Sequence, residues 1–498
     1  MTGSANSLQH ARNYGLFING TETETEAVSQ RFCPGTGEHV ATFASGTAGD
    51  ALDAIAVARR TFEERVWSRK NGPQRSHVLL RLAELMRENA EYLARIEAEE
   101  VGKPVKLARG DVAASIAMVE HAAALAQTAS GEAVDNVNPD VVSLVVREPA
   151  GVIGMITPWN FPLLQLSQKL PYALAAGCTA VIKPAEITAG STVEMARFCK
   201  QAGVPDGVVN VVTGRGSVVG NTIAASPDVD VLSFTGSTEV GARITEVSAA
   251  TTKRLSMELG GKAAAVVLPD ADLEQAANGV VFGAIFNSGE CCVATTRLIV
   301  HESIADELIS RVIEIMGRVR VGPPLDDDSE VGAMIHEAHL ESVLGYIEKG
   351  VAEGGTILLG GNRLIDGAHA SGFYVEPTII DGVKRGDTIF QEEIFGPVLA
   401  VTRFATVEEA AELVNAVDYG LANTIWSAGI QTAIPLAKRL RSGSVWVNTT
   451  LENAPQMPTG GLKRSGYGRE MGTAGYEEFT EPKTITLRLK AAEPFFGI

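Results

Sequence analysis

The chain has 498 residues, of which 45% are hydrophobic and 20% are charged, a composition typical of a globular protein with roughly two or three domains. A formal net charge of −18 at pH 7, with no basic stripe, argues against binding to nucleic-acid phosphates. No apolar stretch reaches the roughly 20 residues of a membrane span, and no leader-like apolar core follows a basic start, so we expect a cytoplasmic protein that is not bound to a membrane.

The first third of the chain is predicted to be mainly helical. Residues 1–45 mix short strand-like pieces with turns, and from Ala51 to Ala133 the apolar residues recur at i, i+3 and i+4. Asn71-Gly72-Pro73 interrupts this pattern and predicts a break between helices. The β-branched run 141–146 then predicts a strand ending at Pro149, in an arm outside the main core.

Two regions of alternating strands and helices follow. Between Val152 and Lys262 this alternation predicts βαβ units and a parallel sheet with helices on both faces. The expected strands are Val152–Ile156, Thr179–Lys183, Val208–Val212, Val231–Phe234 and Arg254–Leu259. A second α/β domain begins near residues 264–268 and runs to about Gly472. Residues 480–489 alternate polar and apolar side chains, which predicts an edge strand that needs a partner.

The cysteines are too few and too irregularly spaced for a disulfide framework or a zinc site, so we expect reduced thiols and no metal. Cys291 and Cys292 stand together just after Gly289, at the end of an apolar run that looks helical. A thiolate there could be a nucleophile presented to a cleft, or both thiols could be small buried hydrophobes. His336-Glu337-Ala338-His339 falls short of the metal-binding H-E-x-x-H spacing, and we predict a solvated helix face.

Three turns at the ends of predicted strands suit a phosphate or a ribose. In residues 213–220 the third glycine is one position too far for G-x-G-x-x-G, so this turn alone is weak. Residues 234–241 offer backbone N–H groups to an anion, although Ser237 could simply cap its helix. Lys183 and Glu186 could both bind ribose hydroxyls. Three such turns at the carboxyl ends of parallel strands indicate a dinucleotide crevice.

Four further segments carry polar residues in unusual settings. Asn160, between two prolines, could donate to a substrate oxyanion or satisfy its own turn. Glu258 ends an apolar strand, where it could be a general base or half of a salt bridge. Paired acids precede a Gly-Pro turn in 391–398, and 460–470 is a glycine-rich loop.

In this order the segments resemble the aldehyde dehydrogenase superfamily, and the resemblance extends from Tyr14 to Leu489. Each motif is modest alone, but the ordered set is specific: PWNFP, KPAE, FTGSTEVG, MELGGK, FNSGECC, EEIFGPV and GGLKRSGYGRE. The resemblance implies an α/β fold, with a Rossmann-like NAD-binding domain of residues 1–132 and 152–262. It also implies a catalytic domain of 263–472, with 133–151 and 473–498 as bridging arms of a homodimer or homotetramer.

The resemblance also assigns catalytic roles. The second cysteine of GECC, Cys292, is the expected nucleophile, with Asn160 and the Cys292 backbone N–H as oxyanion donors. Glu258 is the expected base for thioester hydrolysis, and Lys169 and Glu470 match positions of proton exchange. Aldehyde oxidation is therefore favoured over three alternatives: a CoA-acylating enzyme, in which Glu258 tends to be missing; a non-catalytic binding protein; and a Cys-His hydrolase, for which no motif supplies a histidine.

The implied cofactor is NAD rather than NADP, because a carboxylate at Glu186 hydrogen-bonds a 2′-hydroxyl and repels a 2′-phosphate. The expected cofactor contacts are Ile156, Thr157, Pro158, Trp159, Lys183, Glu186, Gly216, Gly220, Phe234, Thr235, Gly236, Ser237, Val240, Leu259, Glu393 and Phe395.

The expected substrate pocket is polar where relatives are often aromatic or apolar, and its residues are Phe161, Gln165, Gln168, Cys291, Asn453 and Thr459. This lining predicts a polar aldehyde or semialdehyde, without an aromatic box for a trimethylammonium group. Glu290 stands where relatives commonly have Gln, and we expect its charge to raise the pKa of the nearby thiol.

Overall fold

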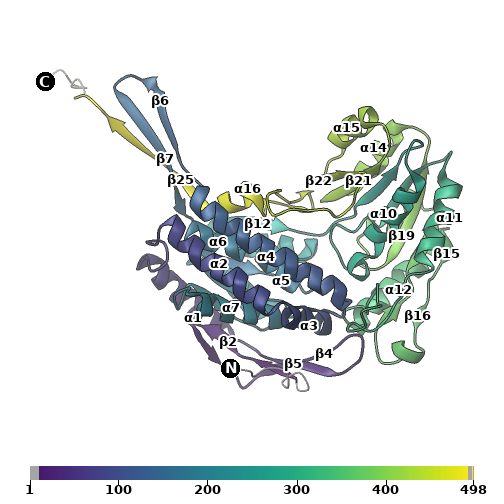
Figure 1. Ribbon diagram of the computed structural model, residues 1–498, viewed down its shortest axis with the longest axis horizontal. Helices are drawn as coiled ribbons and strands as arrows, with labels where there is room; N and C mark the ends of the chain where they lie inside the picture. The colour runs from purple at the N-terminus through teal and green to yellow at the C-terminus, as the bar shows by residue number, and fades with distance from the viewer. Residues whose placement is uncertain (1–10, 492–495, 497–498) are drawn as a thin grey trace.

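The computed structural model describes residues 11–491 and residue 496 of the chain. Residues 1–10, where no leader was expected, and the end of the expected C-terminal arm lie outside the described residues. Two α/β lobes lie side by side, and a narrow β arm projects from the first of them (Figure 1). The predicted α/β class agrees with this architecture.

The first lobe begins with short strands and four helices. Strands β1 (Arg12–Tyr14), β4 (Val28–Phe32) and β5 (His39–Ala44) form a small sheet, and β2 (Leu16–Ile18) and β3 (Thr21–Thr23) extend a larger one. The helices are α1 (Ala48–Glu63), α2 (Gly72–Glu88), α3 (Ala90–Val101) and α4 (Val105–Thr128).

The break predicted at 71–73 is confirmed. The Asn71 side chain accepts a hydrogen bond from the Gln74 N–H and caps α2, with Pro73 in the first turn. Two further breaks were missed. Asn89 separates α2 from α3, and Gly102, at φ 95°, ends α3 in the left-handed region that favours glycine, just before Pro104.

The main sheet of the first lobe has eight strands in the order β24-β12-β11-β8-β9-β10-β2-β3. Its central strands are parallel, as predicted: β8 (Val152–Ile156), β9 (Thr179–Lys183), β10 (Val209–Val211), β11 (Val231–Thr235) and β12 (Arg254–Glu258). Both edges of the sheet are antiparallel, and this was not predicted. At one edge β2 pairs with β10, and at the other β24 (Gly466–Tyr467), from far along the chain, pairs with β12.

Helices cover both faces of this sheet, as the buried strands predicted. On β8, Ile153 and Met155 pack in the core formed with α2, α4, α6 (Leu170–Ala176) and α7 (Gly190–Ala202). Val152 and Ile156 face the opposite core, with α1, α8 (Asn221–Ala225) and α9 (Thr238–Ser248). This alternation follows from the two-residue period of a strand. Because the central strands are parallel, their carboxyl ends meet at the same edge of the sheet.

The second lobe is built on a seven-stranded sheet in the order β15-β18-β19-β14-β13-β21-β22, parallel except for β15. Its strands are β13 (Ala264–Val267), β14 (Arg297–His301), β15 (Thr356–Leu359), β18 (Thr378–Asp381), β19 (Val398–Phe404), β21 (Ala422–Trp426) and β22 (Ser444–Val447). Its helices include α10 (Leu273–Ile285), α11 (Ala305–Met316), α12 (Glu337–Ala352), α14 (Val407–Asn415) and α15 (Ile430–Arg439).

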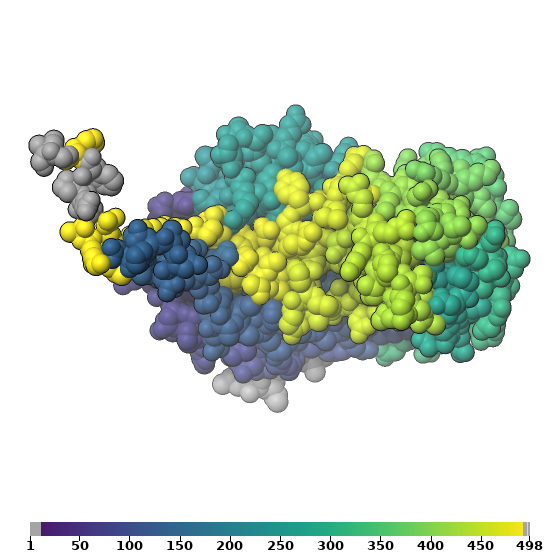
Figure 2. Space-filling model, turned by 90° about the horizontal axis from the view of Figure 1, so that it is seen from above, coloured from purple at the N-terminus to yellow at the C-terminus, as the bar shows by residue number. Residues whose placement is uncertain are grey.

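The arm is a three-stranded antiparallel sheet in the order β25-β7-β6. Strand β25 (Thr480–Arg488) pairs along its whole length with β7 (Val141–Pro149), which also pairs with β6 (Glu132–Asn138). The predicted edge strand is confirmed, and it already has a partner within its own chain. The C-terminal segment, yellow in Figure 2, lies over the boundary between the lobes before it enters the arm.

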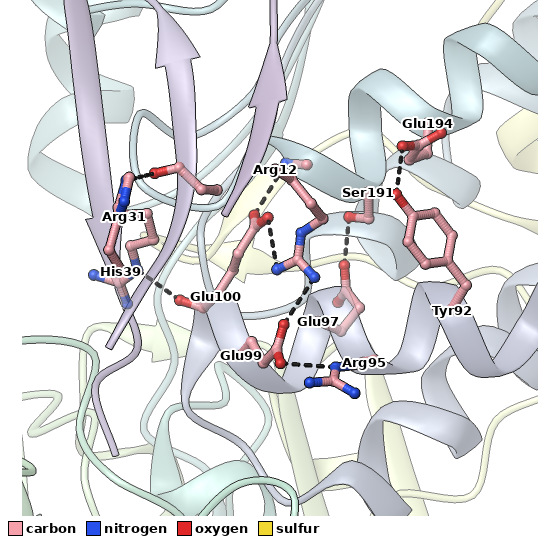
Figure 3. A network of polar contacts seen from close by, with 12 residues as sticks. Arg12, Arg31, His39, Tyr92, Arg95, Glu97, Glu99, Glu100, Ser191 and Glu194 are labelled. Atoms are coloured by element: carbon pink, nitrogen blue, oxygen red, sulfur yellow. Dashed lines mark hydrogen bonds and ion pairs between the residues drawn. The ribbon is translucent and has the colours of Figure 1, made fainter. Parts of the chain in front are cut away.

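A buried polar network fastens the N-terminal strands to α3 and α7 (Figure 3). Arg12 donates to Glu99 over 2.7 Å, and Arg31 donates to the Glu100 carbonyl over 2.8 Å. Ser191 of α7 hydrogen-bonds Glu97. Burial raises the pKa of Glu97 to about 7 and that of Glu100 to about 8, because a charged carboxylate is poorly solvated there.

Within residues 11–491, no helix is long and apolar enough to cross a membrane. The same residues contain no cluster of three or more His, Cys, Asp or Glu side chains suited to a metal ion.

Candidate active site

A cavity of about 430 Å³ opens between the two lobes. All six residues of the predicted substrate pocket line it: Phe161, Gln165, Gln168, Cys291, Asn453 and Thr459. Cys292, Glu258 and Glu470 line the same cavity. Residues far apart in the chain are thus brought to one site at the carboxyl end of the first sheet.

The cysteine pair is presented by an irregular turn after α10. Asn287, Ser288 and Gly289 have φ values of 52°, 58° and 74°, so three consecutive residues lie in the left-handed region. A Cβ on Gly289 would lie 2.2 Å from the Gly396 carbonyl carbon, so only glycine fits. This turn ends the helix and directs Cys292, which is partly exposed, into the cavity.

Asn160 lies beside this turn. Its side chain is buried, and Nδ2 donates to the Glu290 carbonyl oxygen over 3.0 Å. Asn287 Nδ2 donates to the same carbonyl over 3.0 Å and to the Asn160 carbonyl over 3.3 Å. The amide of Asn160 is therefore held next to the cysteine pair with few conformational alternatives.

Three titratable groups, Lys169, Glu470 and Glu258, lie buried close to the thiol. Lys169 Nζ pairs with Glu470 and donates to Thr235 Oγ1 over 2.7 Å. Burial raises the pKa of Glu258 to about 8, although the nearby Lys169 cation opposes the rise. Burial likewise lowers the pKa of Lys169 to about 7. Glu258 Oε1 has no hydrogen-bond partner among the described residues, which leaves it free to bind a water.

The thiol of Cys292 has a pKa raised well above its ordinary value. The first cause is a hydrogen bond with Cys291, followed by burial and by the charges of Glu393 and Glu258. Gly261 packs against the same loop, since a Cβ there would lie 2.1 Å from the Cys292 carbonyl oxygen. A Cβ on the preceding Gly260 would lie 2.2 Å from the Glu393 carboxylate. Steric crowding therefore explains why both positions are glycine.

The predicted cofactor residues gather at the carboxyl edge of the first sheet. Ile156 ends β8, Thr157 and Pro158 follow it, and Lys183 ends β9. Burial lowers the pKa of Lys183 to about 8, against the favourable charge of half-buried Glu186. A Cβ on Gly216 would lie 3.8 Å from Lys183 Nζ, so the glycine leaves open space beside this cation.

The neighbouring turn starts α9. Phe234 and Thr235 end β11, and a Cβ on Gly236 would lie 2.5 Å from the Phe234 ring. Ser237 caps α9 by accepting from the Val240 N–H over 3.3 Å, so the capping alternative is confirmed and Ser237 Oγ is engaged with its own helix. Leu259 adjoins Gly241 at the base of the turn, and Gly220 opens α8.

A second group faces this edge from the other lobe. Glu393 Oε1 accepts from the Gly261 N–H over 2.8 Å, and burial raises the pKa of Glu393 to about 7. The Phe395 and Trp159 rings make an edge contact with centroids 5.4 Å apart. Phe395 has a φ of 58°.

These features fit a dinucleotide. The crevice has a buried lysine, a half-buried carboxylate and glycines that keep the backbone accessible. Thr157 Oγ1 is buried and has no partner within the described part of the chain, as expected of a group that awaits a polar ligand.

The predicted solvated helix face at 336–339 is confirmed for residues 336–338, which are exposed, and is wrong for His339. Residues 336–339 are not simply a solvated helix face: His336 caps α12, but His339 is largely buried and its Nε2 contacts the Phe395 carbonyl oxygen at 2.7 Å. The His339 ring also packs against Trp159, with centroids 5.8 Å apart. Helix periodicity could not reveal this contact, because it joins segments from both lobes.

Glu290 is not among the main causes of the raised pKa of Cys292. Glu290 Oε1 accepts from the Ile335 N–H over 2.9 Å and lies 3.7 Å from His339 Nε2. Burial raises the pKa of Glu290 well above its usual range, which opposes the negative charge that the sequence suggested.

Helix α4 contributes a wall of the cavity that sequence reasoning missed. Asp111 lines the cavity and pairs with buried Lys103 over 2.7 Å. Lys103 Nζ also lies 4.0 Å from the centroid of the Phe161 ring. A carboxylate on the buried side of an amphipathic helix was the available signal, because such a group is seldom buried without a partner.

Comparison with known proteins agrees with this geometry. Residues 21–485 match the model of the aldehyde dehydrogenase family. The chain is 40% identical to betaine aldehyde dehydrogenase of Bacillus subtilis, over 96% of this chain and 98% of that protein. It is 38% identical to peroxisomal aminoaldehyde dehydrogenase 1 of Pisum sativum, over 96% of each.

Two crystal structures are similar throughout. An NAD-dependent aldehyde dehydrogenase from Sinorhizobium meliloti has a TM-score of 0.96 and 40% identity, with 100% of this chain and 99% of that chain covered. Betaine aldehyde dehydrogenase from Staphylococcus aureus, in complex with NAD+, has a TM-score of 0.95 and 35% identity, with 99% of this chain and 98% of that chain covered. The expected fold and the resemblance inferred from the motifs are confirmed, and the chain belongs to the aldehyde dehydrogenase family.

Proposed function

We propose that this aldehyde dehydrogenase oxidises a polar aldehyde to the carboxylic acid with NAD, through a covalent intermediate on Cys292. The observation that carries the proposal is that Cys292, Glu258 and six pocket residues line one cavity. The named relatives support a polar substrate, since betaine aldehyde and aminoaldehydes are polar.

In the first half-reaction the Cys292 thiolate adds to the aldehyde carbon and forms a thiohemiacetal. The Asn160 amide, 3.0 Å from the Glu290 carbonyl, would exchange that acceptor for the oxyanion, together with the Cys292 backbone N–H. NAD supplies the hydride acceptor when bound. Loss of hydride from the former aldehyde carbon leaves a thioester on Cys292.

In the second half-reaction Glu258 deprotonates a water that attacks the thioester and releases the acid and the thiol. Its pKa of about 8 suits a base near neutral pH. Lys169 and Glu470 are paired next to it and would pass the proton towards solvent. The Glu258 carboxylate also favours hydrolysis of the thioester over its transfer to CoA. Its presence argues against a binding protein without turnover.

NAD would be held at the carboxyl edge of the first sheet. Lys183 and Glu186 would contact the adenine ribose, where the Glu186 carboxylate disfavours a 2′-phosphate. Trp159 and the N-terminus of α9, begun by Ser237, would adjoin the pyrophosphate. Glu393 and Phe395 would adjoin the nicotinamide ribose. The NAD+ complex of the Staphylococcus aureus relative supports this cofactor.

We also infer the domain division expected from the sequence: 1–132 with 152–262 for NAD, 263–472 for catalysis, and the arms 133–151 and 473–498. The arms would join a homodimer or homotetramer. In support, Ile485, Leu487 and Leu489 of the arm are 41%, 46% and 62% exposed, and a second copy could cover them. A cytoplasmic location would suit the free thiols.

The test is NAD reduction, followed by absorbance, with single-cysteine variants. Cys292→Ala should abolish reduction while NAD binding, measured by calorimetry, persists. Cys291→Ala is the matched control and should still reduce NAD. If Cys291→Ala were inactive and Cys292→Ala active, the assignment of the nucleophile would be wrong.

A further inference from the structure

The cavity beside Cys292 has charged residues in its wall, but the buried ones are already neutralised. They are Lys106, Asp111, Glu258 and Glu470. Asp111 pairs with Lys103 at 2.7 Å, Glu470 pairs with Lys169, and Lys106 lies 3.9 Å from Glu330. Glu258, with its pKa of about 8, is mostly uncharged at neutral pH. The buried part of the wall therefore offers no unpaired charge to a substrate carboxylate or ammonium group, and Lys106 is an exposed cation in weak contact with Glu330.

The aromatic side chains of the wall are also engaged. Phe161 and Phe286 are the aromatic residues that line the cavity, and they stack on each other with centroids 5.9 Å apart. Lys103 Nζ lies 4.0 Å from the Phe161 ring centroid. A cation–π position on Phe161 is thus taken by a cation of the chain itself, so the pair is poorly suited to a quaternary ammonium group.

Neutral hydrogen-bonding groups are what the wall leaves free. Gln165 is 8% exposed, and its Oε1 is buried without a hydrogen-bond partner among the described residues. An unpaired buried amide oxygen is costly, and a bound donor would remove that cost. Gln168 follows three positions later, and Asn453 and Thr459 add further neutral polar groups.

Resting on the function proposed above, we propose that the preferred substrate is an uncharged aldehyde that carries a hydroxyl group, and that Gln165 Oε1 accepts the hydroxyl hydrogen bond. Apolar residues such as Met118, Leu164 and Val293 complete the wall and would cover the carbon chain. A hydroxyl both donates and accepts, so Gln168 or Asn453 can bond the same group.

The experiment compares kcat/KM, with NAD in excess, for aldehydes that differ in one group. Glyceraldehyde and lactaldehyde are the hydroxylated probes, propanal is their deoxy counterpart, succinic semialdehyde carries a carboxylate, and betaine aldehyde carries a quaternary ammonium. The hydroxylated probe should exceed propanal by about tenfold, the size of one well-placed hydrogen bond together with the cost of leaving its partner unpaired. Both charged probes should fall below it.

Gln165→Met tests the residue, because Met has a similar length and no strong hydrogen-bond acceptor. The ratio of kcat/KM for glyceraldehyde to that for propanal should fall towards one in this variant. Gln201→Leu, an exposed position on α7 outside the cavity, is the matched control and should keep the wild-type ratio. Gln165→Glu, which keeps an acceptor oxygen, should keep more of the preference than Gln165→Met.

The wild-type panel decides the inference even if a variant does not fold. Oxidation of propanal as efficiently as glyceraldehyde, or the highest kcat/KM for a charged probe, would overturn the hydroxyl preference and leave aldehyde oxidation standing. Failure of every aldehyde to reduce NAD would instead refute the proposed function, and the inference with it.

Discussion

The pH dependence of thioester hydrolysis offers a direct test of Glu258. Burial raises its pKa to about 8, and a base acts only when deprotonated. At pH 7 about one-tenth of the Glu258 carboxyl is then ionised, and at about pH 9 roughly nine-tenths. Where hydrolysis limits turnover, kcat should therefore rise roughly ninefold between these two pH values.

Glu258→Gln removes the base and keeps the shape of the side chain. We expect a burst of reduced cofactor close to one equivalent per active site, followed by turnover slowed by about 10²- to 10⁴-fold, the range for loss of a general base. Stopped-flow absorbance separates the two phases. The burst reports addition of the Cys292 thiol and hydride transfer, whereas the steady-state rate reports hydrolysis. The pKa of Cys292 is also raised, so the burst has a pH dependence of its own.

Lys169 supplies the control for the cause of the pKa. Its cation lowers the pKa of Glu258, so Lys169→Met should move the steady-state profile to higher pH. The reasoning would be refuted if Glu258→Gln kept the steady-state rise with pH, or if it lost the burst while still binding NAD.

Two further predictions concern packing around the site. Gly261→Ala would place a Cβ 2.1 Å from the Cys292 carbonyl oxygen and should lower the rate of NAD reduction at least tenfold. Gly345→Ala, at a helical position with open space, is the control and should keep both the activity and the melting temperature. Equal activities of the two variants would contradict the steric argument. Asp111→Leu should lower the free energy of unfolding by about 3–5 kcal/mol, because it leaves the buried Lys103 cation without its partner. In urea unfolding, the double variant Lys103→Met/Asp111→Leu should recover most of that loss. A double variant as unstable as the single one would show that the unpaired charge is not the cause.

Local patterns predicted the sheet of the first lobe well. β8 and β9 begin and end at the predicted residues, because continuous apolar runs between turns are typical of buried parallel strands. The catalytic residues came from the ordered motifs. Ser237 shows the limit of a single motif, since its side chain caps α9 and the motif alone fitted either reading.

What the sequence could not predict depends on contacts between distant segments. Asp111, on α4, enters the cavity only because that helix packs beside α5 (Pro162–Ser167). His339 reaches Trp159 across the boundary between the lobes and packs beside Phe395 of its own lobe. Glu290 follows the left-handed turn at 287–289 and contacts the Ile335 N–H, and such a turn leaves no periodic pattern in the residues.

The returning strands β24 and β25 determine when the fold can be completed. The arm joins residues more than 300 positions apart, as in the Arg147–Glu477 ion pair. Glu258 pairs with Gly466 of β24, which follows the strands of the second lobe in the chain. Such long loops close slowly, because their entropy is lost before the contacts form. During synthesis the first lobe must therefore wait, with the edge of β12 unpaired, until the second lobe has emerged. A nascent chain halted before residue 466 should be prone to aggregation and should depend on chaperones, although most of its cofactor crevice has already been made.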